Sequence, residues 1–100
     1  MSEARIRIDK WLWHVRLVKT RGLAADLVTG GHVRLNGTRL DKPGRAIGPG
    51  DVVTVVAGGR VRVLRVLDCG LRRGPASEAQ TLYADLDAVP PQPAPGEQLS

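Results

Sequence analysis

The sequence predicts an α+β fold with two N-terminal helices, strands joined in antiparallel hairpins, and a short C-terminal helix. Three observations lead to this prediction. Apolar residues recur at helical spacing over the first 30 residues, they alternate with polar residues from residue 33 onward, and Asn-Gly and Gly-Gly pairs mark tight turns between the alternating segments. A chain of 100 residues is long enough for one small domain and not for two.

The first helix is expected over residues 9–18. Asp9 is a suitable N-cap because its carboxylate can accept a hydrogen bond from a free N–H of the first turn. Two apolar rows at helical spacing can both face a core. They leave the polar residues of this segment on the solvent side: Lys10, His14 and Arg16.

The second helix is expected over residues 20–29. Thr20 is a suitable N-cap, and the apolar stripe of this helix includes Leu23 and Leu27. Glycines follow at positions 30 and 31, where the left-handed conformation that ends a helix has no steric cost for glycine. Only one or two residues are left to link the helices, so we expect a tightly packed pair.

Strands are expected after the second helix. Residues 33–35 and 38–40 form an antiparallel hairpin, because Asn36-Gly37 suits a turn whose two central positions need positive φ. Residues 41–50 are rich in glycine and proline and are expected to form a loop.

A second hairpin is expected from two further strands, over residues 51–57 and 60–67, joined by Gly58-Gly59. Ser77 can cap a short third helix over residues 78–86, where apolar residues again recur at helical spacing.

The chain is expected to divide into three parts. Residues 5–70 form the main domain, residues 71–87 form a C-terminal turn and short helix, and residues 88–100 form a disordered, acidic, proline-rich tail. The tail is expected to be disordered because it has four prolines within 90–95 and few residues that could enter a core.

The positive charge is concentrated in the first three-quarters of the chain. The net charge is +5, with +6 on residues 1–45, +3 on residues 46–73 and −4 on residues 74–100. A basic field of this kind favours a polyanionic partner, most often a nucleic acid.

Several classes of protein are disfavoured by what the sequence lacks. One cysteine rules out an internal disulfide framework, and two histidines make a structural zinc site improbable. No apolar stretch has the length of a membrane span, and the N-terminus lacks the apolar core of a signal peptide. No nucleophile–base set or phosphate-binding glycine loop is present. We therefore expect a cytoplasmic protein without enzymatic activity, cofactor or metal.

The start of the second predicted helix is the most specific candidate for an anion-binding site. A helix N-terminus attracts phosphate through its free N–H groups and partial positive charge, and Lys19 and Arg21 add two cations beside Thr20. Because these cations oppose the helix dipole, we expect them to serve binding rather than stability. A second cluster surrounds the predicted hairpin and the loop after it: His32, Arg34, Asn36, Lys42 and Arg45.

The motifs along the chain resemble the RNA-binding domain named after ribosomal small-subunit protein four. They are Arg7-Ile8-Asp9-Lys10-Trp11-Leu12, Lys19-Thr20-Arg21, Gly30-Gly31-His32-Val33-Arg34-Leu35-Asn36-Gly37 and Pro49-Gly50-Asp51-Val52-Val53. Arg72-Arg73-Gly74-Pro75-Ala76 is similar to the C-terminal stretch of one subgroup, the bacterial fifteen-kilodalton heat-shock protein.

The resemblance implies an αL RNA-binding motif, in which the two N-terminal helices pack on a small, mostly antiparallel sheet, and it implies no enzymatic activity. The implied partner is structured ribosomal RNA on the large subunit, with tRNA as a further candidate, in stalled-ribosome rescue or the heat-shock response. We expect the protein to be a monomer. Asp9 is expected to orient other residues, since a carboxylate repels phosphate. The implied RNA contacts are Arg7, Lys10, Lys19, Thr20, Arg21, His32, Arg34, Asn36, Lys42 and Arg45.

Three other functions remain open from the residues alone. One is a DNA-binding helix pair, although the second predicted helix offers mostly Leu, Ala, Asp and Val for reading bases. Another is the RNA-binding domain of an RNA-modifying enzyme, detached from its catalytic part. The third is an adaptor whose proline-rich tail docks into an aromatic groove.

Overall fold

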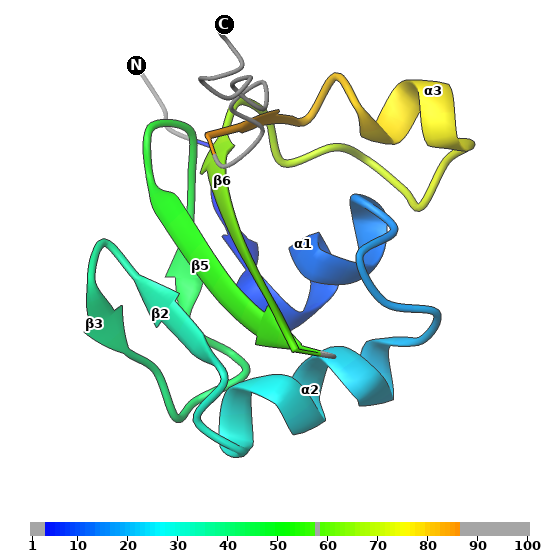
Figure 1. The fold of residues 1–100 in the computed structure, drawn as a ribbon. Coiled ribbons are helices and arrows are strands. Elements are labelled where there is room, and N and C mark those ends of the chain that lie inside the picture. The colour runs from blue at the N-terminus through cyan, green and yellow to red at the C-terminus, as the bar shows by residue number, and fades with distance from the viewer. Residues whose placement is uncertain (1–3, 58, 87–100) are drawn as a thin grey trace, which may run out of the picture.

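Two helices cover one face of a five-stranded sheet in the computed structural model, which describes residues 4–57 and 59–86 (Figure 1). The helices are α1 (Ile8–His14) and α2 (Arg21–Thr29). The sheet has the order β3-β2-β5-β6-β7, and each neighbouring pair is antiparallel. Its strands are β2 (Val33–Leu35), β3 (Thr38–Arg39), β5 (Val52–Ala57), β6 (Arg60–Val66) and β7 (Tyr83–Asp85). The predicted α+β class is confirmed.

A smaller pairing and a short helix complete the fold. The strands β1 (Ile6–Arg7) and β4 (Ala46–Ile47) pair antiparallel, and α3 (Ala76–Ala79) precedes β7. The sequence predicted only a loop over residues 41–50, so β4 was missed. A two-residue strand carries no alternation of its own, and β4 forms because its partner lies across the chain at residues 6–7.

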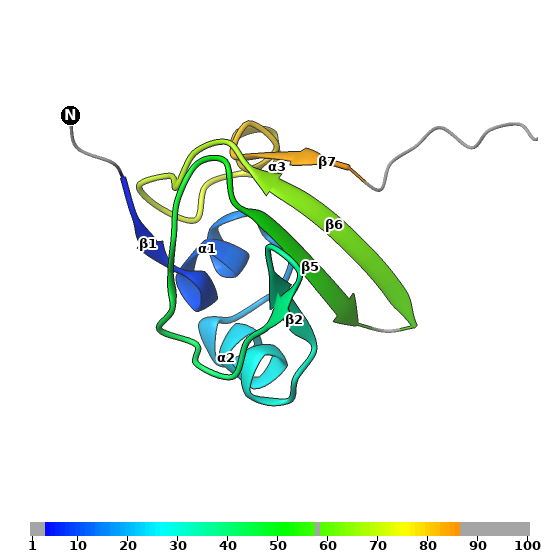
Figure 2. The ribbon, with the colours of Figure 1, turned by 90° about the vertical axis from the view of Figure 1, so that its left-hand side faces the viewer.

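The core lies between the inner face of the sheet and the two helices, and the sheet curves over α1 and α2 (Figure 2). Alternate residues of β2, β5 and β6 point inward, which explains the period-2 pattern of these strands. The fully buried residues include Ile8, Trp11 and Leu12 of α1 and Val28 of α2. Trp11 also donates a hydrogen bond from Nε1 to the Asp68 carbonyl oxygen at 3.0 Å.

The first helix is shorter than predicted. It begins at Ile8 and ends at His14, the N-cap residue is Arg7 rather than Asp9, and six residues rather than one or two separate it from α2. Arg16 ends the helical path because it adopts a left-handed conformation with φ of +63°. Its guanidinium donates to the Gly74 carbonyl oxygen at 2.7 Å, a partner 58 residues away that helical spacing could not reveal.

His14 is buried, so the prediction that it faces solvent is wrong. Its exposed fraction is 1%, and its Nδ1 lies 3.1 Å from the Cys69 carbonyl oxygen. The segment between β6 and α3 covers this side of α1, and Cys69 itself is buried as well. The side of α1 on which His14 lies was predicted to face solvent, and it is instead covered by the segment between β6 and α3.

The second helix and the first hairpin agree with the sequence. The Thr20 hydroxyl caps α2 by accepting a hydrogen bond from the Leu23 N–H at 3.1 Å. After the helix, Gly31 has φ of +83°. Asn36 and Gly37 both have positive φ, 51° and 87°, as the predicted tight turn requires.

The C-terminal prediction is wrong in part. The third helix covers residues 76–79 after Pro75, not residues 78–86, and residues 83–85 form strand β7 beside β6. The edge of β6 offers unpaired backbone groups, and β7 satisfies them, which overrides the helical spacing. An ion pair between Arg62 and Asp85 at 2.9 Å joins the two strands. The predicted tail, residues 88–100, lies outside the described residues.

Candidate nucleic-acid interface

Asp9 holds two arginines at the start of α1. Its side chain is only 6% exposed. Arg7 donates to it from Nε at 3.1 Å and from NH2 at 3.0 Å, and NH2 of Arg21 lies 3.7 Å from Oδ1. The hydrogen bond to Asp9, and then the charge of Asp9, raise the pKa of Arg7. Asp9 thus orients cations from β1 and α2, in line with the orienting role expected for it.

The guanidinium groups remain open to solvent on their other edges. The exposed fractions of the two side chains are 57% for Arg7 and 44% for Arg21. A guanidinium has five N–H donors in a fixed fork. Because Arg7 uses one Nε–H and one NH2 donor on Asp9, three donors stay available to an anion.

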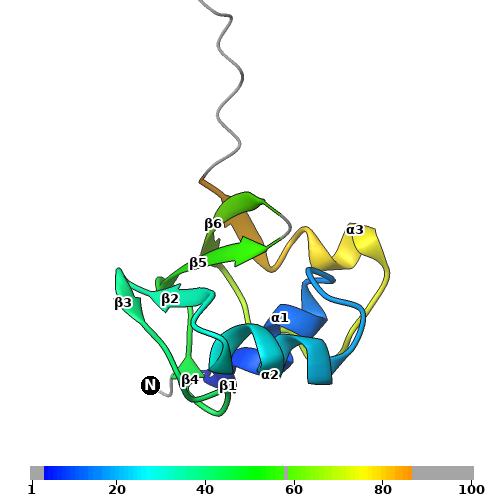
Figure 3. The ribbon, with the colours of Figure 1, turned by 60° about the horizontal axis from the view of Figure 1, so that its bottom comes forward.

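The loop before β4 brings further cations to the same place. The Ile8 N–H donates to the Arg45 carbonyl oxygen at 2.9 Å, and the Asp9 N–H donates to the Pro43 carbonyl oxygen at 3.2 Å. Gly44 lies beside the guanidinium of Arg7, where an added Cβ would make an ordinary contact of 3.6 Å with Cζ of Arg7. Figure 3 shows β1 and β4 beside the start of α1.

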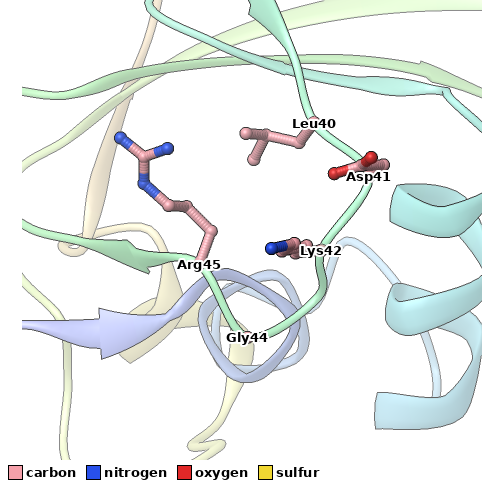
Figure 4. A pocket seen from close by; sticks show the side chains of 5 residues that line it. All are labelled: Leu40, Asp41, Lys42, Gly44 and Arg45. Atoms are coloured by element: carbon pink, nitrogen blue, oxygen red, sulfur yellow. The ribbon is translucent and has the colours of Figure 1, made fainter.

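This loop surrounds a hollow of about 470 Å³ (Figure 4). Lys42 and Arg45 border it, together with Leu40, Asp41 and Gly44. The structure therefore joins four of the predicted contacts, Arg7, Arg21, Lys42 and Arg45, into one basic surface. We call these four residues together with Asp9 the Asp9 cluster.

Three predicted residues lie near the Asp9 cluster along α1 and α2. Lys19 and Thr20 precede α2 and are exposed, and Lys10 is half-buried in the first turn of α1. The Thr20 hydroxyl is already engaged as the helix cap. Lys10 and Lys19 have no side-chain partner among residues 4–57 and 59–86.

The hairpin residues are not gathered into this cluster. Arg34 lies between buried Val33 and Leu35, so it faces the side of the sheet opposite the helices, directly across from Arg39. Both polar atoms of the Asn36 side chain are engaged: Oδ1 accepts from the Val52 N–H at 2.8 Å, and Nδ2 donates to Asp51 at 3.2 Å. That Arg34 and Asn36 contact RNA stays a prediction.

His32 borders a groove that the sequence did not reveal. Its imidazole packs on the backbone of Gly30, where a Cβ would lie 2.9 Å from Cδ2 of the ring. Leu23 lines the same groove and is 48% exposed, although its place in the apolar stripe of α2 predicted a core position. Helical spacing shows which face a residue occupies, and only the packing shows whether that face is covered.

Comparison with known proteins assigns the family. Residues 6–53 match the S4 domain. The chain is 44% identical to a heat shock protein 15 homolog from Aeromonas salmonicida, over 87% of this chain and 65% of that protein. It is 40% identical to heat shock protein 15 of Escherichia coli strain K12, over 80% of this chain and 59% of that protein. The chain thus spans about three-fifths of the length of these relatives.

Solved structures agree with the sequence matches. The trimeric structure of Vibrio cholerae heat shock protein 15 superposes with a TM-score of 0.77 at 38% identity, covering 82% of each chain. The solution structure of a hypothetical protein, HP1423, gives a TM-score of 0.68 at 31% identity, over 80% of this chain and 95% of that one.

The fold and these matches define the class of protein: the chain belongs to the S4-domain family. Within that family it lies near the heat shock protein 15 group. The predicted resemblance is confirmed. None of the described helices is long and apolar enough to cross a membrane, and residues 4–57 and 59–86 contain no group of three side chains placed to hold a metal ion.

Proposed function

We propose that this protein binds structured ribosomal RNA on the large ribosomal subunit, in stalled-ribosome rescue or the heat-shock response, with tRNA as a further contact. The observation that carries the proposal is the Asp9 cluster, which lies within the residues that match the S4 domain. The names of the relatives support the heat-shock part. The protein acts by binding, in the cytoplasm, as a monomer, without catalysing a reaction.

The mechanism is electrostatic and depends on preorganised arginines. Arg7 and Arg21 are held on one edge by Asp9, so less side-chain entropy is lost when their free edges meet a phosphate. Lys42 and Arg45 extend the basic surface, and each phosphate neutralised releases condensed counterions. RNA helices are recognised mainly by shape and backbone, which suits a surface of this composition.

A salt titration tests the RNA contact. In Lys19→Ala/Lys42→Ala both lysines lack side-chain partners among the described residues, so the fold should be unaffected. With single-stranded or irregular ribosomal RNA, the slope of log K against log salt should become shallower by about 1.4, or about 0.7 for each phosphate contact. Arg65→Ala is the matched control, because Arg65 is exposed on β6, away from the Asp9 cluster. An unchanged slope in the lysine variant would contradict the proposal.

Sedimentation with isolated subunits tests the ribosomal target. The protein should co-sediment with the large subunit, and Lys19→Ala/Lys42→Ala should dissociate from it at lower salt than Arg65→Ala. Co-sedimentation with the small subunit alone, or with neither subunit, would overturn the proposal that the large subunit is the target. Competition between structured RNA and duplex DNA separates RNA binding from a DNA-binding helix pair.

A further inference from the structure

A shallow apolar groove lies between α2 and the end of β5. Its volume is about 600 Å³, and its walls are aliphatic side chains: Leu17, Val18, Leu23, Leu27 and Ala57. A second hollow of about 270 Å³ shares Leu27, Ala57 and His32 with it and continues to Val56. Leu23 and Val56 are 48% and 40% exposed, so the groove presents apolar surface to solvent.

Three polar side chains border the groove: Lys19, Asp26 and His32. None of the three forms a side-chain hydrogen bond or ion pair with a described residue. Gly30 has an ordinary φ of −79°, so glycine is needed there for space, because a Cβ would meet the His32 ring at 2.9 Å and the Asp26 carbonyl oxygen at 3.0 Å. The groove therefore has apolar walls, one imidazole that lies against Gly30 and borders both hollows, and a cation and a carboxylate without partners among the described residues.

We propose that this groove receives one unpaired nucleobase of the bound RNA, a proposal that rests on the RNA-binding function above. Apolar side chains and an aromatic ring can hold the faces of an extruded base, and Lys19 stands where the phosphate of the same nucleotide would lie, just before the N-terminus of α2. The positive charge of the neighbouring surface favours a polyanion over an apolar protein segment or a second copy of this basic chain.

Asp26 indicates which base the groove would take. Its carboxylate repels phosphate and accepts hydrogen bonds from N–H groups only. Guanine carries two parallel N–H donors on its Watson–Crick edge, at N1 and N2, whereas adenine, cytosine and uracil carry one donor group each on that edge. The geometry points to an unpaired guanine, with its edge on Asp26 and its ring beside His32.

Binding of RNA hairpins with and without a single bulged nucleotide tests the groove. The wild-type protein should prefer a hairpin with a bulged guanine over the fully paired hairpin by about tenfold, within the range for one stacked base. Leu23→Gln should remove most of this preference, whereas Leu71→Gln is the matched control, because Leu71 is 98% exposed and lines neither hollow. Asp26→Asn should abolish the preference for guanine over a bulged uridine.

Two further variants separate the groove from the phosphate contacts. Gly30→Ala displaces the His32 ring and should lower the bulge preference while leaving the salt slope unchanged. Lys42→Ala, which lies outside the groove, should make the salt slope shallower by about 0.7 and retain the guanine preference. If Leu23→Gln fails to fold, Val56→Thr provides the same test at the second hollow, with little change in side-chain volume.

The outcomes distinguish this inference from the proposed function. If no structured RNA binds, the proposed function fails. If RNA binds and the bulged and paired hairpins bind equally, or if Leu23→Gln retains the preference, the nucleobase site is wrong and the RNA surface lies elsewhere. A change of oligomeric state in Leu23→Gln, seen by light scattering, with unaltered RNA selectivity would assign the groove to contacts between copies of the chain and overturn the inference.

Discussion

Asn36 and Asp51 form a polar bridge between the β2–β3 turn and the start of β5, and exchanging the two residues tests its role. Oδ1 of Asn36 accepts from the Val52 N–H at 2.8 Å, and Nδ2 donates to Oδ1 of Asp51 at 3.2 Å. The other oxygen of Asp51 accepts from the Gly48 N–H at 2.9 Å. The position therefore needs one acceptor for the Val52 N–H and one donor for Asp51, which an amide supplies and a carboxylate does not. The single variant Asn36→Asp should destabilise the fold because it lacks the donor.

The magnitude follows from the contacts. In Asn36→Asp the bond to Val52 is retained, the donor to Asp51 is lost, and two carboxylates face one another. An exposed hydrogen bond contributes about 0.5–1 kcal/mol, and two like charges about 4 Å apart in water repel by about 1 kcal/mol. The free energy of unfolding should fall by about 1.5 kcal/mol, which lowers Tm by roughly 6–12 °C at this size. The positive φ at this position suits aspartate as well as asparagine, so it adds little.

Adding Asp51→Asn to Asn36→Asp should restore most of the stability. The new amide at position 51 can donate to the new carboxylate while its oxygen still accepts from Gly48. Thermal melts of the two single variants and the double variant form a double-mutant cycle, in which we expect a coupling of about 1 kcal/mol or more. Additive effects, or a single variant as stable as the wild type, would refute the bridge. RNA affinity that falls in the refolded double variant would show that the Asn36 amide also contacts RNA.

Three further predictions follow from single positions. Gly37→Val should lower the free energy of unfolding by more than about 1 kcal/mol from backbone strain alone, since φ is +87° and a Cβ meets nothing within 4 Å; a thermal melt with unchanged Tm would contradict this. Arg72→Ala should raise the pKa of Glu78, seen by NMR titration, because the hydrogen bond from Arg72, together with its charge, holds that pKa below 4.5. The lowered pKa means that this pair stabilises the fold above pH 4.5 and ceases to do so as the pH falls through the folded-state pKa, so wild type and variant should converge in acid. Cys69 is buried, and burial followed by the charge of Asp68 raises its pKa; a thiol-reactive disulfide reagent should label it much more slowly in the native protein than in urea, and equal rates would show that the segment over α1 opens freely.

Local signals in the sequence predicted the elements that depend on nearby residues. The cap of α2 joins Thr20 to a backbone N–H only three residues later, and the β2–β3 turn needs positive φ at two adjacent positions. The strands β5 and β6 showed their alternation because one face of each is buried against the helices. The resemblance to the S4 domain rests on short contiguous motifs, which can be read without knowing the fold, so the family could also be predicted from the sequence, and the S4 match over residues 6–53 confirms it.

The sequence by itself determined the α+β class, the boundaries of α2, the tight turn at Asn36-Gly37 and the family. Only the tertiary structure decided where α1 ends, which side of it is buried, and that residues 83–85 extend the sheet. The physical reason is that these features depend on partners far along the chain: His14 meets Cys69, and Arg16 meets Gly74. The same holds for the candidate site, because Asp9 brings together arginines from β1 and α2, and no local pattern records that approach.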